Sequence, residues 1–278
     1  MKLTKFSSLP GTTPEEKLKL WANNSPIYCQ IKYHGISARY IPGKGLFTRQ
    51  GKQWDLARFP ATFLKDLGQI EDFALYMELT LPGPFPAAAG VLNVNSDLPI
   101  PSSLIAYLFD VEHLTKPATE QAFSWRLAQI QTFPVFTHIT PAATYIHTDA
   151  IYADRRYTRV IEADYEGIVY RTDPAFLLYG DTPNPFMVKR KKLHTDEGIC
   201  IGVEEGKGKR KGMAGYLVLR LKNGKQLRVG GGAGMTEKLL IDLLSNPPLN
   251  KPVTFSYEEL SEAGIPLRPQ FISVRIYE

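Results

Sequence analysis

Short apolar stretches alternate with glycine- and lysine-rich turns in residues 199–232, and this pattern limits the possible folds more than any other feature of the chain. The segment reads ICIGVEEGKGKRKGMAGYLVLRLKNGKQLRVGGG, and its Asn223-Gly224 dipeptide is a strong signal for a β-hairpin turn. A helical pattern follows at 236–246, and strand patterns follow at 253–260 and 271–277. About five short strands with one intervening helix in about 80 residues predict a small Greek-key barrel of the OB type.

The residues before this barrel predict a domain of helices and antiparallel sheets. Strand patterns occur at 73–80, 104–111, 164–171 and 186–192, and a strand, a glycine turn and a second strand occupy 27–50, with Pro42-Gly43-Lys44-Gly45 as a connection. Helices are expected at 57–70, at 118–131 and after the capping box Thr13-Pro14-Glu15-Glu16, up to about Ala22. The segment 81–102, rich in Pro, Gly, Ala and Ser, is expected to be a loop.

The expected fold class is therefore α+β, with a first domain of residues 1–195 and an OB barrel of residues 196–278. The boundary is expected near 193–198, where LHTDEG ends the preceding strand. A chain of 278 residues is long enough for two such domains.

Composition favours a protein of the cytoplasm. No apolar run approaches the roughly 20 residues that a membrane-spanning helix requires, and the N-terminus turns polar before a signal-peptide core forms. The two cysteines, Cys29 and Cys200, have no metal-binding spacing and are expected to be small core residues in a reduced protein.

Positive charge is concentrated in one part of the chain. Residues 186–230 contain twelve lysines and arginines against four acidic residues, a net charge of +8, whereas the whole chain carries +5 and the remainder therefore −3. One basic band on an otherwise slightly acidic protein indicates a polyanionic partner.

Lys32 is the candidate nucleophile. It ends a strand pattern in IKYHGISARY (31–40), just before a glycine that permits close approach of backbone or ligand. A lysine amine becomes a nucleophile when desolvation or neighbouring cations favour its neutral form. By strand alternation Lys189 and Lys191 share one face, which suits phosphate oxygens. Glu166 is able to hold a metal ion and Phe109 to stack on a base. Taken singly, Glu78 and Glu166 also fit solvated strand charges, and Phe109 also fits a core position.

The ordered series of these residues resembles the covalent nucleotidyltransferases, and specifically the small ATP-dependent DNA ligases of phage, viral and bacterial type. The resemblance runs from about residue 28 to the C-terminus. Its motifs are KYHG (32–35), Thr48-Arg49, YMELTLPG around Glu78, Phe109-Asp110 with Arg126, EGIVYR (166–171), FMVKRK (186–191), the segment beginning IGVEEGKGKRKG, and IPLRPQFISVR (265–275).

The resemblance implies that the chain seals 5′-phosphate/3′-hydroxyl nicks in duplex DNA. Lys32 would attack the α-phosphorus of ATP and carry AMP, which would pass to the 5′-phosphate before the 3′-hydroxyl attacks. Arg49 and Glu78 would contact the ribose or a nearby phosphate, and Phe109 would stack on adenine. Glu166 would assist Mg²⁺, with Mn²⁺ as a substitute, while Lys189 and Lys191 would hold the α-phosphate.

The same resemblance gives the basic band a partner. Lys207, Lys209, Arg210 and Lys211 would lie on a barrel loop and follow the backbone of nicked duplex DNA. A merely solvated lysine turn is the alternative for this loop. Arg268 and Arg275 would touch nucleic acid or orient pyrophosphate. The expected protein is a monomer without membrane contact, encoded by a phage, virus or bacterium, that works in DNA replication, repair or recombination.

Two residues depart from the DNA-ligase pattern. His34 replaces the usual aspartate of KxDG, and Ser37 stands where an arginine normally contacts the nick phosphate. Arg39 lies two residues later on the same strand face and is expected to bind nucleic acid. KxHG is similar to one branch of RNA ligases, which lacks the C-terminal barrel. An RNA ligase and a catalytically inactive nucleic-acid-binding relative therefore stand as alternatives.

Overall fold

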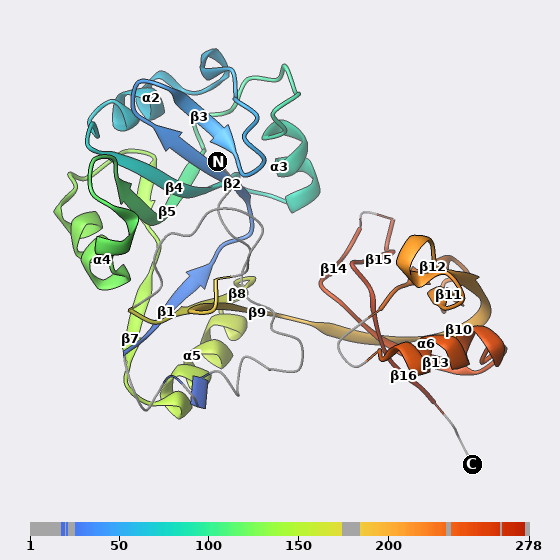
Figure 1. Cartoon of the computed structure of the whole chain (residues 1–278). Coiled ribbons are helices and arrows are strands. Elements are labelled where there is room, and N and C mark those ends of the chain that lie inside the picture. The colour runs from blue at the N-terminus through green and yellow to red at the C-terminus, as the bar shows by residue number, and fades with distance from the viewer. Residues whose placement is uncertain are drawn as a thin grey trace. The chain divides into compact units, whose positions relative to one another are not determined.

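The computed structural model describes residues 18–19, 21, 26–173, 184–231, 235–261 and 263–275. The chain divides into two compact units, Met1–Arg190 and Lys191–Glu278. Both consist mainly of antiparallel sheets with a few helices, so the expected α+β class is confirmed (Figure 1). Within the described residues, every helix is too short or too polar to cross a bilayer.

A five-stranded sheet with the order β3-β2-β4-β5-β6 forms one half of the first unit. Its strands are β2 (Ile36–Ile41), β3 (Gly45–Thr48), β4 (Phe73–Thr80), β5 (Ile105–His113) and β6 (Ile139–Pro141). One face is apolar, and its Leu75 and Met77 belong to the same buried cluster as Phe63 and Leu67 of helix α2 (Ala61–Leu67). The alternate residues of β4, including Glu78, therefore point to the opposite, polar face.

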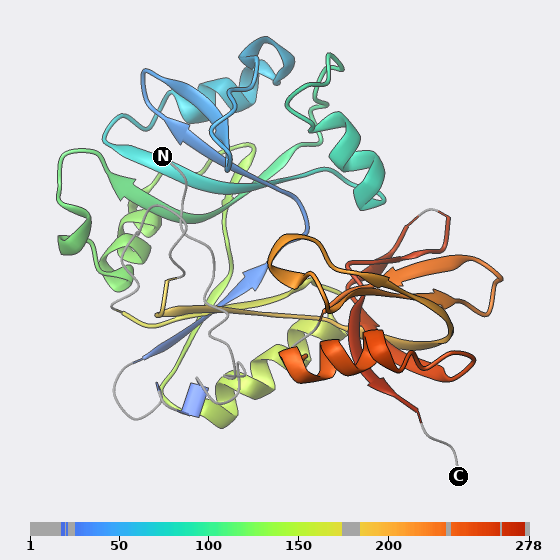
Figure 2. The same ribbon diagram turned by 45° about the vertical axis from the view of Figure 1, so that its right-hand side comes forward.

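A four-stranded sheet with the order β7-β1-β8-β9 forms the other half. Its strands are β1 (Ile27–Lys32), β7 (Thr144–His147), β8 (Gly167–Arg171) and β9 (Met187–Lys191). Helix α5 (Ala150–Glu162) lies along one face, where Ala153 and Val160 pack with Cys29 and Ile31 (Figure 2). Because strand residues alternate, Gln30 and Lys32 point away from α5.

The chain passes from the second sheet to the first through the short connection Tyr33–Gly35. Gly35 lies so close to β4 that an added Cβ would clash with the carbonyl oxygen of Leu79 and lie 2.9 Å from Glu78 Cγ and from Thr80 Cγ2. Glycine is therefore required here for steric reasons. We call this connection between the two sheets the crossing point, because it follows Lys32 directly and packs against Glu78.

A buried ion cluster joins the two sheets. Asp110 of β5 accepts hydrogen bonds from Arg126 of α4 (Phe123–Thr132) at 2.7 and 3.2 Å, and from Arg171 of β8 at 2.5 Å. All three side chains are almost completely buried. Burial by itself raises the pKa of Asp110, but the two guanidinium groups outweigh it and hold the pKa below its usual value.

The second unit is a small barrel. Its strands are β10 (His194–Glu205), β11 (Ala214–Arg220), β12 (Gln226–Val229), β13 (Pro252–Tyr257), β14 (Glu259–Leu260), β15 (Pro266–Leu267) and β16 (Gln270–Val274), with helix α6 (Glu237–Ser245) between β12 and β13. β10 pairs with β13 along its first half and with β11 along its second half. A bridge between Gly230 and Gln270 links the two edges of the sheet, as expected for an OB-type barrel.

Most expected elements of the described chain are present. The strand at 73–80, the Asn223-Gly224 hairpin and the helix at 236–246 are confirmed, and Gly224 has a φ of +79° that the turn requires. The helix expected at 57–70 is a 3₁₀ turn at Leu56–Arg58 followed by α2. The helix expected at 118–131 is likewise a 3₁₀ turn at Ala118–Glu120 followed by α4.

One expectation is wrong. Residues 81–102 are not all loop, because helix α3 (Phe85–Val91) begins at its prolines, which fit the first turn of a helix. The strand before LHTDEG does end there, since β9 stops at Lys191, and a new strand begins at His194 and pairs with β13.

The sequence patterns also gave no expectation for β6, β7 and α5, which occupy 139–162. The capping box at 13–16 lies outside the described residues, although Leu18, Lys19 and Trp21 are helical.

Replacing Gly35 with alanine is expected to destabilise the first unit by about 1–3 kcal/mol, because a backbone oxygen must move to admit the new methyl group. Chemical denaturation measures the change. Gly90→Ala is the matched control: Gly90 lies in α3 with nothing within 4 Å of an added Cβ, so its substitution should be neutral or stabilising. Equal effects of the two substitutions would contradict the steric requirement at Gly35.

Replacing Asp110 with asparagine is expected to lower the free energy of unfolding by about 3–5 kcal/mol, because Arg126 and Arg171 would lose their buried counter-ion. The folded-state pKa of Asp110 lies below its unfolded value of about 3.9. Its contribution is therefore complete above that pH and is lost as the pH falls through the folded-state pKa.

Denaturation of wild type and Asp110→Asn at several pH values tests this linkage. The difference should be largest above about pH 4 and should shrink below it. Asp97→Asn, at an exposed position, should change the unfolding free energy by less than about 0.5 kcal/mol at any pH. A difference independent of pH down to strong acid would exclude ionised Asp110 as its source.

Candidate functional site

Lys32 and Glu166 form an ion pair at the ends of two neighbouring strands. Lys32 is the last residue of β1 and pairs with Gly167 of β8, so the residue before Gly167 comes within reach. The Lys32 Nζ donates to Glu166 Oε2, and the two side chains are only 18% and 14% exposed. The structure therefore brings the expected nucleophile and the expected metal-binding carboxylate into direct contact.

Glu78 of β4 borders Gly35, three residues after Lys32. It is opposite Ser37 of β2 and Tyr107 of β5, and its Cγ borders Gly35. Arg49 follows β3, whose Thr48 pairs with Ala38, so the arginine lies at the Gly35 end of the sheet. Unlike Glu78, Arg49 is exposed on the surface.

Aromatic side chains surround the crossing point. Tyr33 stacks on Tyr107 with ring centroids 3.5 Å apart and an interplanar angle of 7°, and Tyr165 approaches Tyr33 edge-on at 5.6 Å. Burial raises the pKa of Tyr33 to about 12, so its hydroxyl stays protonated. No motif singled out these tyrosines, although Tyr33 and Tyr165 adjoin Lys32 and Glu166 in the sequence.

Phe109 is attached to β1 through Gln30. The buried Gln30 Nε2 donates to the Phe109 carbonyl at 3.0 Å and to Thr144 Oγ1 at 3.1 Å, and Arg171 lies 5.9 Å from the centre of the Phe109 ring. This bond holds the Phe109 backbone against the strand that ends in Lys32. Gln30 carries no sequence signal beyond its position two residues before the lysine.

His34, the departure from KxDG, has an aromatic neighbour. Its ring stacks on Phe85 of α3 with centroids 3.9 Å apart and an interplanar angle of 17°. Because α3 lies in the segment expected to be a loop, the sequence gave no indication of this contact.

Strand β9 carries Lys189 and Lys191 on the face opposite α5. Its Val188 packs in the α5 cluster and its Arg190 pairs with Asp154 of α5, so the intervening lysines point the other way. Lys189 is exposed. Lys191, at the start of the second unit, donates to Glu258 Oε2 at 2.8 Å, and Arg268 donates to the same oxygen.

The carboxylates of the site fit a magnesium ion that takes most ligands from phosphate and water. Among the described residues, no three His, Cys, Asp or Glu side chains gather into a metal site. Mg²⁺ is commonly held by one or two carboxylates together with substrate phosphates. Glu166 is a carboxylate of this kind, and it is already beside Lys32.

Arg39 lies away from the exposed surface. Its Nη2 donates to Glu112 Oε2 at 2.7 Å, Tyr76 donates to the same oxygen at 2.6 Å, and the Arg39 side chain is 17% exposed. Contact between Arg39 and nucleic acid stays a prediction, and it requires this pair to open.

The basic loop of the second unit is exposed and well ordered by hydrogen bonds. Lys207, Lys209, Arg210 and Lys211 lie in and around a 3₁₀ turn, Gly208–Arg210, and all four are exposed. Glu205 accepts from the Gly212 N–H at 2.7 Å and thereby ties the two ends of the loop together. A cavity of about 670 Å³ beside the loop is lined by three cations, Lys207, Arg210 and Arg228, by Tyr216, and by the carboxylates of Glu204 and Glu205, of which Glu204 pairs with Arg228.

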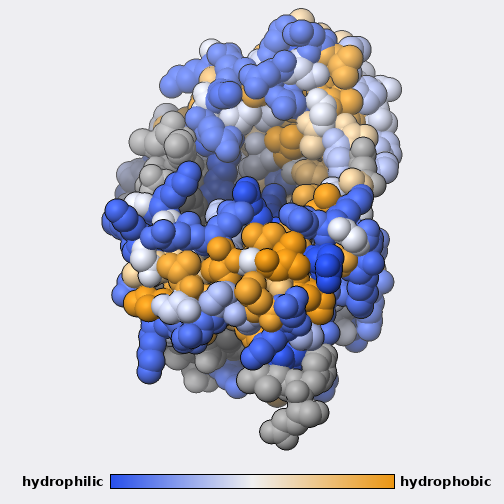
Figure 3. Space-filling model, turned by 90° about the vertical axis from the view of Figure 1, so that its right-hand side faces the viewer, coloured by the Kyte–Doolittle hydropathy of each residue, from blue (hydrophilic) through white to orange (hydrophobic). Residues whose placement is uncertain are grey.

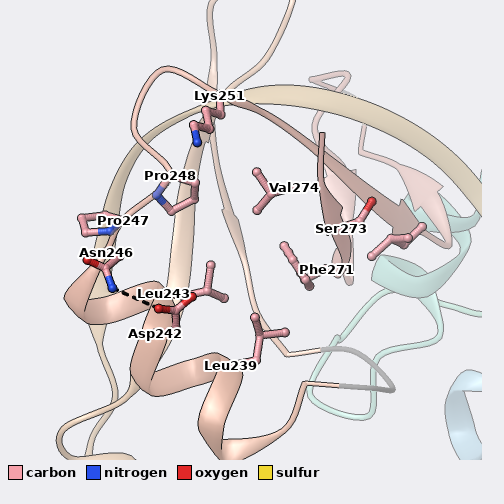
Figure 4. Close-up of a pocket in the computed structure, with 11 residues that line it drawn as sticks. Leu239, Asp242, Leu243, Asn246, Pro247, Pro248, Lys251, Phe271, Ser273 and Val274 are labelled. Atoms are coloured by element: carbon pink, nitrogen blue, oxygen red, sulfur yellow. Dashed lines mark hydrogen bonds between the residues drawn. The ribbon is translucent and has the colours of Figure 1, made fainter. Parts of the chain in front are cut away.

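A second groove of the barrel has a different character. Helix α6, the loop after it and β16 enclose about 740 Å³, with Leu239, Leu243, Phe271 and Val274 pointing inward (Figure 4). The Asn246 amide donates to Asp242 at 3.0 Å across its rim. Apolar surface gathers in one area of the face seen in Figure 3, with hydrophilic residues around it. The mainly apolar lining of the groove between α6 and β16 does not suit a polyanion, so the basic loop at 207–211 is the candidate nucleic-acid surface.

Comparisons with known proteins agree with this architecture. Residues 205–275 match the DNA ligase OB-like domain family. The fold is similar to that of a Lig E DNA ligase from a study of DNA binding with a minimal scaffold, with a TM-score of 0.70, 23% identity and coverage of 99% of this chain and 98% of that one. It is similar to the ATP-dependent DNA ligase of bacteriophage T7 in complex with ATP (TM-score 0.53, 15% identity, coverage 99% and 98%).

The fold is also similar to Chlorella virus DNA ligase-adenylate, with a TM-score of 0.52, 17% identity and coverage of 99% of both chains. No curated protein matches the sequence at a significant level. The resemblance to the small ATP-dependent DNA ligases is therefore confirmed at the level of the fold, and residues 205–275 match their OB-like domain.

Proposed function

We propose that this protein is an ATP-dependent DNA ligase that seals 5′-phosphate/3′-hydroxyl nicks in duplex DNA through a lysine–AMP intermediate. The observation that carries the proposal is the partly buried ion pair of Lys32 and Glu166, set beside Gly35 and Glu78 within a ligase fold. The neighbours solved with ATP and as a ligase-adenylate support the choice of nucleotide.

Lys32 performs the first step as a nucleophile. The Nζ ammonium group loses a proton to solvent, and the resulting amine attacks the α-phosphorus of ATP, so that an N–P bond forms while the bond to the pyrophosphate oxygen breaks. Nζ releases a second proton to solvent as the phosphoramidate forms. Glu166 holds the Nζ in position through their hydrogen bond before ATP enters. Mg²⁺, held by Glu166 and the phosphates, would neutralise phosphate charge, and Mn²⁺ would substitute for it.

The remaining residues position the nucleotide. Phe109 stacks on adenine, Glu78 and Arg49 contact the ribose or an adjacent phosphate, and Lys189 and Lys191 hold the α-phosphate. AMP then passes from Lys32 to the 5′-phosphate of the nick. The 3′-hydroxyl attacks that phosphate, forms the new phosphodiester bond and releases AMP.

Nicked duplex DNA is the proposed partner, bound by the monomer in the cytoplasm. The exposed cations of the loop at 207–211 follow the phosphate backbone without reading sequence. A Lig E neighbour described as binding DNA with a minimal scaffold supports this use of a small chain. Both cysteines are free and buried, which suits a reducing compartment.

A second candidate function is RNA ligation. His34 gives the motif KYHG, and its stacking on Phe85 places an aromatic pair next to Lys32 where the DNA-ligase pattern has a carboxylate. The matching OB-like domain at 205–275 favours DNA over this candidate.

Replacing Lys32 with alanine is expected to abolish covalent labelling by ATP that carries ³²P at its α-phosphate, because the N–P bond cannot form. Gel analysis after incubation with Mg²⁺ measures the label. Lys44→Ala is the control, since Lys44 is an exposed lysine in the β2–β3 turn, and it should label like wild type. Lys32→Ala should still join a nick that already carries AMP on its 5′-phosphate.

Three outcomes would count against the proposal. Label on Lys32→Ala would remove Lys32 as the nucleophile, and an unlabelled wild type would support an inactive relative. Sealing assays with nicked DNA, DNA/RNA hybrids and RNA duplexes decide the substrate. Faster joining of RNA than of DNA would favour the second candidate.

Replacing Lys209 and Lys211 together with alanine is expected to weaken binding of nicked DNA and to reduce the slope of log K against log salt by about 2. Fluorescence anisotropy over a salt series measures the slope. The double substitution Lys238→Ala/Lys251→Ala removes the same charge elsewhere in the second unit and should leave the slope unchanged. Similar slopes for the two variants would show that the loop does not carry the DNA contacts.

A further inference from the structure

One carboxylate of the second unit holds two cations that lie far apart in the sequence. Glu258 Oε2 accepts from Lys191 Nζ at 2.8 Å and from an Arg268 guanidinium nitrogen. The Lys191 and Glu258 side chains are 12% and 21% exposed, whereas that of Arg268 is 63% exposed. A single oxygen therefore faces two cations, and the cluster as a whole carries one excess positive charge.

The backbone fixes this cluster in place. The Glu258 N–H donates to the Leu267 carbonyl at 3.2 Å, at the base of the short β14–β15 ladder. Arg268 follows directly, and its φ of +52° is an unfavourable conformation for a residue with a side chain. A strained backbone that is retained at one cation of the cluster indicates that the position of this side chain matters.

The proposed function gives Lys191 a contact with the α-phosphate, and the ligase resemblance implies that Arg268 touches nucleic acid or orients pyrophosphate. Lys191 ends the FMVKRK segment, and Arg268 lies in IPLRPQF. Without an anion between them, the two side chains would repel each other, and the carboxylate keeps them together. A polyphosphate carries more negative charge than a carboxylate, so it is able to replace Glu258 between the two cations.

We infer that Glu258 is a positioning residue that occupies the place of a phosphate oxygen between Lys191 and Arg268 until ATP enters. This inference rests on the proposed function. Before ATP binds, Glu258 keeps both cations oriented through its hydrogen bonds. It then competes with the triphosphate for these cations, and it pairs with them again when pyrophosphate leaves. It thereby weakens nucleotide binding and favours product release.

Binding of inorganic tripolyphosphate, measured by calorimetry, tests the competition without any chemistry. Glu258→Gln keeps the side-chain shape but removes the charge, and it is expected to bind tripolyphosphate about tenfold more tightly than wild type. The KM for ATP in self-adenylation should fall by a similar factor, and inhibition by pyrophosphate should strengthen. Glu258→Asp, which restores the charge, should bind tripolyphosphate as wild type does.

Two further variants keep the result interpretable. Glu237→Gln removes one charge at an exposed position in α6 and should leave tripolyphosphate affinity unchanged. Arg268→Gln, alone or together with Glu258→Gln, should weaken binding relative to the corresponding parent. Unchanged or weaker binding in Glu258→Gln, or wild-type affinity in Arg268→Gln, would overturn the inference. Absence of covalent AMP would contradict the proposed function and leave the tripolyphosphate result intact.

Discussion

The buried cluster of Asp110, Arg126 and Arg171 is the interaction on which the first unit depends. It joins β5 of one sheet, β8 of the other and helix α4 through a single carboxylate. Such a cluster adds little net stability over an apolar core, because three charges lose water when they are buried. Its importance lies in geometry, since the loss of one member would leave uncompensated charge between the sheets. Phe109 precedes Asp110 and Glu166 begins the segment that leads to Arg171, so the cluster also aligns two parts of the candidate site.

Lys32 lies where the chain passes from one sheet of the first unit to the other. β1 delivers the lysine, and Gly35 then presses against β4 beside Glu78 because it has no side chain. Tyr33, which follows Lys32 in the same connection, stacks on Tyr107 of β5. Lys32, Glu166 and Glu78 are thus positioned in or directly beside strands, which would give the proposed phosphoryl transfer a precise arrangement.

Two groups of cations in the second unit differ in how strongly solvent screens them. Lys191 and Arg268 share the partly buried carboxylate of Glu258, which partly neutralises their charge. The cations of the loop at 207–211 are exposed, so salt screens them and their attraction for an anion depends strongly on ionic strength. The first group suits a defined polyphosphate, whereas the second suits the extended backbone of a duplex. The net charge of +8 in residues 186–230 does not by itself separate a partly buried cation such as Lys191 from the exposed cations of the loop.

The sequence alone determined the local elements and the order of the motif residues. Strand alternation and glycine turns predicted β4, the β11–β12 hairpin and the barrel, because these signals are local. Helix α5 was missed although Asp149 caps it and Ala153, Tyr157 and Val160 recur at helical spacing, while α3 was missed because its prolines resemble loop residues but begin a helix. Only the tertiary structure decided that Lys32 meets Glu166, 134 positions away, and that Gln30, Tyr107 and Glu258 join the candidate sites. Such contacts depend on how distant segments of the chain pack within each unit, which no short-range pattern in the sequence predicts.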